Sequence, residues 1–237
     1  MASPSNNIGA AEAIDASLYP DLVEAGGLAP LLRQMASTQH TDLGEVEPDT
    51  PRGRGLYVTA RMTSDRGPVK VLLGLDSRRF SISLGDAETA RGWASGSTPD
   101  ITEAARAIEA WRHGSKLKDM TERFPFVDYP RLSQGYEDGN PVETQWSLLL
   151  EDDDFNTYRS LLAALHGDPV ISHLFPYFSH WVLRLTKDPF DLDTNQIAIS
   201  DSPEASRYEV YLLHGGIRIT VTADEVVDRV RSLLNSL

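Results

Sequence analysis

The chain has 237 residues, a formal net charge of −13 and no cysteine. Such a polyanion repels nucleic acids and anionic membranes, because affinity for both comes largely from Lys and Arg that neutralise phosphates. The lack of cysteine excludes disulfides, thiolate metal ligands and cysteine nucleophiles together. We therefore expect no nucleic-acid partner and no membrane partner.

From the N-terminal segment we expect no signal peptide. Residues 1–17 (MASPSNNIGAAEAIDAS) lack the basic stretch and the apolar stretch of a signal peptide. No run approaches the roughly 18–20 apolar residues that a membrane span needs. Together with the absence of cysteine, this favours a cytoplasmic protein.

The first half of the chain predicts helices, then an antiparallel sheet, then helices. Apolar residues recur at helical spacing from Ile14 to Met35, and Gly26-Gly27 divides them into two short helices. Alternating apolar residues then predict strands, and these cover 56–62, 69–75, 80–84 and, more weakly, 89–94, with a short edge strand at 43–46. A helix over 100–113 follows, for which we expect Thr98 as the N-cap, and a second helix covers 116–124.

The second half of the chain repeats this order. Residues 126–141 show little periodicity, and Gln145–Leu150 is predicted to form a short strand. Acidic residues at 151–154 open a helix that continues to Leu165, with one more turn at 170–174. Strands are predicted over 177–185, 196–199, 208–213 and 217–221. Thr222 and Glu225 then form a capping box that starts a final helix over 223–236.

These elements predict an α+β fold with mainly antiparallel sheets and a pseudo-duplicated helix–four-strand–helix unit. The predicted organisation is an N-terminal half over 1–125, an irregular connection over 126–150 and a C-terminal half over 151–237. The halves form either two domains or one compact domain. If the duplication is real, the groove between the halves is the natural place for a ligand.

Two groups of residues were considered as metal sites. His166, His173 and His180 are spaced by seven, but Gly167 and prolines between them break any common helix. Residues 188–195 (DPFDLDTN) are similar to the start of a calcium loop but lack its glycine and its final glutamate. We expect isolated histidines, an acidic turn, no metal and no cofactor.

The familiar motifs of DNA binding and catalysis are absent or incomplete. Residues 110–125 have the cadence of a helix-turn-helix, but five basic and five acidic residues between 100 and 123 leave no basic face. Ser179 and His180 are adjacent, and neighbours on a strand point to opposite faces, so we do not expect them to pair. The GxSxG, Walker A, GxGxxG and HExxH motifs do not occur. Catalytic residues therefore stay unassigned, and so does the question of whether the protein is an enzyme.

The most unusual chemistry lies in His173–Leu185 (HLFPYFSHWVLRL). As one continuous strand, its residues would alternate between two faces, and the more apolar set, assigned to the core, is Tyr177, Ser179, Trp181, Leu183 and Leu185. Phe178, His180 and Arg184 would share the other face and are our candidate ligand-binding residues. His180 and Arg184 would stand roughly 13 Å apart and hold opposite ends of an anionic or polar ligand. The alternative is that both pair with surface acids.

Two segments carry a family resemblance. The first is GWASGSTPDITEAARAIEAWRHGSKLKDMTERFPFV, which contains Trp93, Trp111 and Phe124-Pro125-Phe126. The second is LFPYFSHWVLRL, together with the closing helix TADEVVDRVRSLL. Over about residues 90–237 the chain resembles an uncharacterised actinobacterial family labelled as natural-product biosynthesis proteins. The chain departs from the family at Trp181, where a small residue is expected. The resemblance implies a context in secondary metabolism and names no reaction.

Three functions follow as hypotheses. The first is an accessory or tailoring protein of natural-product metabolism that binds a small-molecule intermediate or a partner protein. The second is a cofactor-independent cyclase or isomerase with a cleft between the halves, since such enzymes need only a shaped pocket and a few polar groups. The third is an immunity-type or structural protein-binding module.

Overall fold

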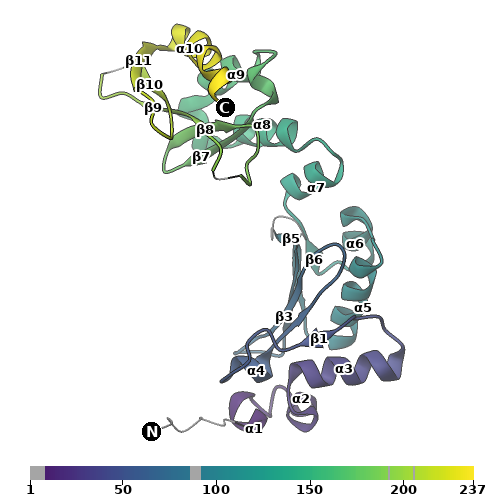
Figure 1. Ribbon diagram of the computed structural model, residues 1–237. Coiled ribbons are helices and arrows are strands. Elements are labelled where there is room, and N and C mark those ends of the chain that lie inside the picture. Colours follow the sequence, from purple (N-terminus) through teal and green to yellow (C-terminus); the bar gives the residue numbers. More distant parts are fainter. Residues whose placement is uncertain (1–8, 86–91, 192, 205) are drawn as a thin grey trace, which may run out of the picture. The chain divides into compact units, whose positions relative to one another are not determined.

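The computed structural model describes residues 9–85, 92–191, 193–204 and 206–237. The chain divides into two compact units, Met1–Pro130 (unit 1) and Arg131–Leu237 (unit 2), each with its own sheet and its own apolar core (Figure 1). The predicted α+β class with mainly antiparallel sheets is confirmed. Each sheet has one strand more than predicted, with six strands in unit 1 and five in unit 2 among the described residues.

Unit 1 begins with three helices, α1 (Ala10–Ala13), α2 (Pro20–Ala25) and α3 (Leu28–Gln39). Gly26 and Gly27 separate α2 from α3 with φ angles of 84° and 128°, a region that glycine adopts readily because it lacks a Cβ. The predicted division of this stretch at Gly26-Gly27 is therefore confirmed. Leu28 and Leu32 of α3 are fully buried in the core of unit 1.

The sheet of unit 1 is a meander in which each strand pairs with the next, and its strands are β1 (Val46–Glu47), β2 (Thr59–Met62), β3 (Val69–Leu73), β4 (Phe80–Gly85), β5 (Gly92–Thr98) and β6 (Val127–Asp128). The predicted strand over 56–62 is only half right, because its first part is the helical turn α4 (Gly55–Val58). The Thr59 hydroxyl donates to the Gly55 carbonyl at 2.7 Å and stabilises that turn. Residues 89–91 of the predicted fourth strand lie outside the described residues.

Two helices close unit 1, α5 (Ile101–Arg112) and α6 (Leu117–Arg123). The N-cap of α5 is Asp100, whose carboxylate accepts from the Thr102 N–H at 2.8 Å, and the prediction of Thr98 was wrong. Thr98 is instead the last residue of β5. The predicted apolar stripe of α5 is buried, with Ile108 and Trp111 fully inaccessible.

The helical segments of unit 2 are α7 (Arg131–Glu137), α8 (Pro141–Glu151), η1 (Asp153–Tyr158), α9 (Arg159–His166), η2 (Ile171–His173), η3 (Ala223–Glu225), α10 (Val226–Leu233) and η4 (Leu234–Ser236). The prediction of an irregular segment with a strand at Gln145–Leu150 was wrong, because α7 and α8 occupy it. Pro141 starts α8, and Trp146 and Leu149, three residues apart, place one helical face in the core. The capping box is confirmed, since Glu225 accepts from the Thr222 N–H at 2.9 Å.

The sheet of unit 2 is also an antiparallel meander, with strands β7 (Phe175–Ser179), β8 (Val182–Thr186), β9 (Ile197–Asp201), β10 (Arg207–Leu212) and β11 (Ile219–Thr222). The segment predicted as one strand over 177–185 is a hairpin, with His180-Trp181 as its two-residue turn. The prediction failed because this turn contains no Gly, Asn, Asp or Pro, the residues that usually mark one.

The two faces of the unit 2 sheet differ in chemistry. One face carries Leu183, Leu185 and Ile199, which are buried against the helices of the unit. The opposite face, called the outer face below, carries a row of cross-strand neighbours, and this row consists of Tyr177, Arg184, Ala198 and Tyr211. The hairpin β7–β8 therefore presents apolar side chains to the core and polar side chains to the outer face.

Candidate functional site

The turn of the β7–β8 hairpin has an unusual backbone. His180 and Trp181 both have positive φ angles, 52° and 63°. Positive φ at both central residues is the geometry of the two-residue turns that match the twist of a hairpin, and Asn-Gly or Asp-Gly normally supply it. A bulky residue such as tryptophan is an outlier there, because its Cβ approaches the following carbonyl at a cost of about 1–2 kcal/mol.

Trp181 is exposed at this turn and rests on other aromatic rings. Its side chain is 64% exposed, whereas Trp111 and Trp146 are fully buried. The Trp181 ring meets the edge of Phe155 at a centroid distance of 6.3 Å, and Phe155 in turn stacks on Phe178 at 4.3 Å. The rings of Phe155, Phe178 and Trp181 form what we call the hairpin aromatic cluster. The prediction that Trp181 lies in the core was wrong.

Tyr158 anchors this cluster to the rest of unit 2. Its ring lies 5.0 Å from Phe178, and its hydroxyl donates to the Asp201 carboxylate at 2.8 Å. Burial of the phenol raises the pKa of Tyr158 to about 12, and the hydrogen bond to Asp201 and the charge of that carboxylate act in the same direction. Tyr158 is therefore neutral at physiological pH and serves as a hydrogen-bond donor.

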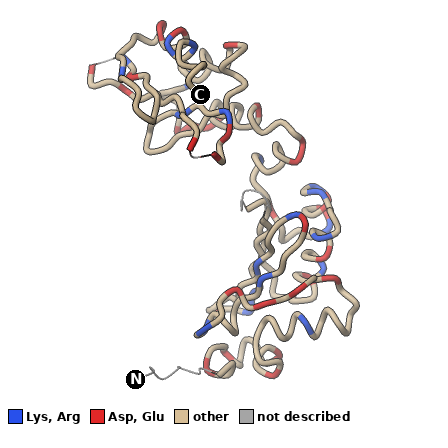
Figure 2. Tube along the Cα trace, in the orientation of Figure 1, with Lys and Arg blue, Asp and Glu red and all other residues tan. Residues whose placement is uncertain are grey.

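Acidic residues precede the aromatic cluster in the chain and are abundant in unit 2. Asp152, Asp153 and Asp154 directly precede Phe155, and all three are exposed. Unit 2 as a whole has 17 acidic and 8 basic residues, and Figure 2 shows the acidic positions in red along its chain. An exposed tryptophan in a unit with so many more acidic than basic residues is suited to a partner surface that combines an apolar pocket with basic residues.

The three predicted ligand-binding residues do not share one face. Phe178 packs against the helical core, His180 lies in the turn, and Arg184 lies on the outer face beside Tyr177. The guanidinium of Arg184 stands over the Tyr177 ring, 5.9 Å from its centroid. The Tyr177 hydroxyl donates to the buried Gln196 carbonyl at 2.6 Å, which holds that ring in place.

Ser179 and His180 lie closer together than the strand interpretation allowed. The Ser179 Oγ is 3.3 Å from the His180 Nδ1. The expectation that they cannot pair was wrong, because His180 follows the end of β7 and its turn geometry rotates the ring toward Ser179. This contact is at the exposed tip, and it places one hydroxyl at the edge of the outer face near Arg184.

The other histidine and acidic candidates have structural contacts. His166 stacks on Trp146 at 5.3 Å, and its Nε2 lies 2.9 Å from the Glu143 carboxylate. In the acidic loop, Asp191 accepts from the backbone N–H groups of Asp193 and Thr194, as expected of an acidic turn. Within the described residues no group of three or more His, Cys, Asp or Glu side chains is arranged to hold a metal ion.

Unit 1 contains a polar hollow that sequence reasoning missed. It has a volume of about 430 Å³ and is open to solvent; the residues that line it are Asp42, Thr63, Ser64, Asp65, Arg112 and His113. The Asp42 carboxylate lies 3.3 Å from both the Arg112 guanidinium and the His113 Nε2. The Asp42 carboxylate accepts a hydrogen bond from the Gly44 N–H and lies beside Arg112 and His113. These interactions together outweigh the effect of partial burial and lower the pKa of Asp42. Asp42 and Arg112 are 70 positions apart, so no local pattern could have linked them.

We interpret this hollow as a structural clip. The Arg112 guanidinium donates to the Thr63 carbonyl and packs so closely on Gly44 that a Cβ there would lie 2.5 Å from it. Arg112 thereby fastens the loop at Asp42 and the turn at Thr63 to the end of α5. Its charge is balanced by Asp42, so the hollow offers no uncompensated cation to a ligand.

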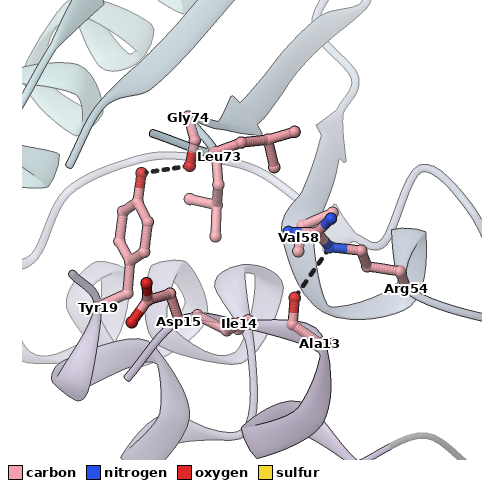
Figure 3. Close-up of a pocket in the computed structure, with 9 residues that line it drawn as sticks. Ala13, Ile14, Asp15, Tyr19, Arg54, Val58, Leu73 and Gly74 are labelled. Atoms are coloured by element: carbon pink, nitrogen blue, oxygen red, sulfur yellow. Dashed lines mark hydrogen bonds between the residues drawn. The ribbon is translucent and has the colours of Figure 1, made fainter. Parts of the chain in front are cut away.

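A second hollow in unit 1 is far too small for a ligand. Its volume is about 10 Å³, which is room for about one water molecule. Figure 3 shows Tyr19 reaching from one side to donate to the Gly74 carbonyl at 2.9 Å, and Arg54 donating to the Ala13 carbonyl at 2.9 Å from the other. These bonds hold the N-terminal helices against the sheet.

Among the described parts of the chain, no helix is both long and apolar enough to cross a bilayer. A family of unknown function, DUF6193, matches residues 140–234, which is most of unit 2 and less than half of the chain. The expected relation to an uncharacterised family is thus confirmed for this part, and the match carries neither an actinobacterial nor a natural-product label. No curated protein and no solved structure matches the chain.

Proposed function

We propose that this chain is an accessory protein that binds a partner protein through the hairpin aromatic cluster of unit 2. The observation that carries the proposal is Trp181, which is 64% exposed in a backbone conformation that tryptophan rarely adopts. A strained exposed residue that glycine could replace without strain points to a role outside folding, because selection for stability alone would remove it. Tryptophan is also among the residues that contribute most to binding at protein interfaces.

The chemistry of the surroundings specifies the partner. The exposed carboxylates at 152–154 directly precede Phe155, whose ring contacts Trp181, and among the described residues a basic neighbour is found for Asp153, which lies 3.5 Å from Arg159. We therefore expect a partner with an apolar pocket for Trp181 and Lys or Arg residues around that pocket. Charge complementarity of this kind accelerates association and makes it sensitive to salt.

The proposed setting is a bacterial secondary-metabolism pathway, in which the chain would hold a biosynthetic partner protein. This part rests on the resemblance of residues 90–237 to proteins with natural-product labels. Deletion of the gene should then change the profile of secondary metabolites without changing growth. An unchanged metabolite profile would contradict the setting and leave the binding proposal to its own test.

The binding proposal is tested with the full chain as bait in an extract of its source organism. Wild type is compared with Trp181→Gly, which removes the ring and relieves the backbone strain, and with Val170→Ala, which truncates another residue of unit 2 that is 53% exposed. A protein that wild type and Val170→Ala retain but Trp181→Gly loses is then purified and titrated. Trp181 is the most exposed of the four tryptophans, so the part of the fluorescence change that Trp181→Gly abolishes should report the titration.

Three results together support the proposal. The purified partner changes the fluorescence of Trp181, binds Trp181→Gly at least tenfold more weakly, and loses affinity as salt is added. Equal retention of every captured protein by wild type and Trp181→Gly would overturn it. A partner whose affinity is indifferent to salt would overturn the assignment of a basic surface.

A further inference from the structure

Arg184 differs from the other arginines of unit 2. Each of the others donates a hydrogen bond or forms an ion pair, and these are Arg131, Arg159, Arg207, Arg218, Arg229 and Arg231. Arg184 has no such partner among the described residues, although acidic residues outnumber basic ones about two to one in this unit. Within the described part of unit 2, Arg229 also lacks a carboxylate partner, but it donates to the Ser232 hydroxyl, so Arg184 is distinguished by having neither a hydrogen bond nor an ion pair.

The position of Arg184 is defined by its neighbours. Its Nε is buried and has no hydrogen-bond acceptor, while its guanidinium stands over the Tyr177 ring. The Nε atoms of Arg112 and Arg229 are buried without an acceptor too, so the feature particular to Arg184 is that its terminal Nη groups have no acceptor among the described residues either. Stacking on Tyr177 limits the rotamers of Arg184 and keeps the guanidinium on the outer face of the hairpin.

A hydroxyl lies within reach of the same place. Tyr177 pairs with Arg184 across the hairpin and Ser179 pairs with Val182, so Ser179 and Arg184 are diagonal neighbours on one face. Diagonal residues of an antiparallel pair are about 7–8 Å apart, a span that an arginine side chain bridges. A group bound by the Arg184 guanidinium could therefore also accept from the Ser179 hydroxyl, which His180 Nδ1 contacts at 3.3 Å.

We propose that Arg184, Ser179 and the Tyr177 ring form a binding site for a small aromatic carboxylate. The forked guanidinium matches a carboxylate in two parallel hydrogen bonds, donated by its two terminal Nη groups, since the Nε is buried beneath them. The Tyr177 ring offers a flat surface to a planar ligand. A phosphate monoester carries nearly two charges, and the excess acidic residues of unit 2 repel it more strongly than a carboxylate with one charge.

The test is an NMR titration of the full chain with benzoate, followed through the Arg184 Nε–H signal and the Ser179 amide. We expect saturable shifts with a dissociation constant on the order of 1–10 mM, as suits one charged contact and one ring contact. Arg184→Gln should weaken binding at least tenfold. The matched control is Arg207→Gln, which removes an exposed arginine paired with Glu204 and should leave the affinity unchanged.

Additional ligands and variants distinguish carboxylate binding from binding of the ring alone and from general anion binding. Benzamide, a neutral analogue of the same shape, and inorganic phosphate should each bind at least tenfold more weakly than benzoate. Should Arg184→Gln fail to fold, Arg184→Lys keeps the charge without the fork and should weaken binding at least threefold. The proposal is overturned by equal shifts with benzamide or phosphate, by an unchanged affinity in the Arg184 variants, or by the absence of saturable shifts. Trp181→Gly should bind benzoate normally, which separates this site from the partner surface.

Discussion

Two strand connections show how differently the two units treat a turn. In unit 1, the connection from β3 to β4 (Gly74–Arg79) surrounds the Tyr19 hydroxyl, which donates to the Gly74 carbonyl and accepts from the Arg79 N–H, both at 2.9 Å. Arg78 in the same connection forms two bonds to the Asp21 carboxylate, at 2.7 and 2.8 Å. In unit 2, the side chains of the His180-Trp181 turn have only peripheral contacts among the described residues, namely the Ser179 hydroxyl 3.3 Å from His180 and the Phe155 ring against Trp181 at 6.3 Å.

The two connections distinguish side chains that stabilise the fold from side chains that are exposed and free to bind a partner. The unit 1 connection is fastened to α2 by the Tyr19 hydroxyl and by the ion pair between Arg78 and Asp21, so these groups already have partners within the fold. The unit 2 turn stays exposed, accepts backbone strain and displays an aromatic ring to solvent. Residues of the first kind should affect folding when changed, and residues of the second kind should affect binding.

The largest effect is expected for Tyr19→Ala. Tyr19 is 2% exposed, and its ring packs edge-on against Phe80 at 5.8 Å. Its truncation should lower the free energy of unfolding by about 3–5 kcal/mol, because it opens a cavity and leaves the Arg79 N–H without an acceptor. Urea titration measures this loss, and Tyr19→Phe serves as a control that keeps the ring. A loss no larger than that of Trp181→Ala would contradict the comparison.

The next effect is expected for Asp168→Ala in unit 2. Burial raises the pKa of Asp168, but hydrogen bonds from the Ile171 and Val170 N–H groups and from Arg231 outweigh it, so the pKa is lowered below 3.8. Removing this buried carboxylate should cost about 2–4 kcal/mol in unfolding free energy, since two backbone donors and one cation lose their acceptor.

The lowered pKa also predicts a pH dependence. Because the folded-state pKa lies below the unfolded value, the stabilisation by Asp168 is present above about pH 4 and is lost as pH falls through the folded pKa. The difference in unfolding free energy between wild type and Asp168→Ala should therefore shrink in acid. A difference that is constant from pH 6 to pH 2.5 would show that Asp168 is not stabilised as a carboxylate.

A gain in stability is expected when the His180-Trp181 turn is replaced by residues that adopt positive φ angles readily. Replacing the turn by the double change His180→Asn and Trp181→Gly supplies residues that adopt positive φ readily. We expect the unfolding free energy of the full chain to rise by about 1–2 kcal/mol, measured by urea titration, together with the loss of partner binding. A fall in stability would mean that the Trp181 ring contributes to folding and would weaken the functional interpretation.

The smallest effect is expected for Trp181→Ala. The ring is mostly exposed and touches Phe155 only by its edge, so its removal should change the unfolding free energy by less than about 1 kcal/mol. The strand interpretation of the sequence predicted a loss of about 3–5 kcal/mol, as for a core residue. Calorimetric melting of the variant beside wild type decides between these two values.

The periodic elements were predictable because their patterns are local. The stripe from Ile101 to Trp111 repeats at helical spacing, and the alternation in β3 and β4 places every second side chain in the core. The capping box at Thr222 and Glu225 is also a contact between near neighbours. Where the spacing of apolar residues within one segment determines a helix or strand, that element can be predicted from the amino-acid sequence.

The candidate sites depend on contacts that no local pattern contains. The segment His173–Leu185 contains the aromatic, histidine and arginine residues of the hairpin, but its sequence does not show that the chain reverses at His180-Trp181. Pairing of β7 with β8 satisfies the backbone hydrogen bonds of both strands and thereby offsets a turn that neither residue favours. Because the chain reverses there, Trp181 lies at the surface, Phe178 packs on the core and Arg184 lies on the outer face.

The sequence by itself thus determined the α+β class, most of the strands and helices, and the residues that carry unusual chemistry. Only the tertiary structure decided which of those residues face each other, because that depends on pairing across the chain. Phe155 lies 26 positions from Trp181, yet their rings meet at 6.3 Å. Such contacts come from the burial of unit 2's apolar core, against which Phe155 of η1 packs, and this burial brings η1 beside the hairpin.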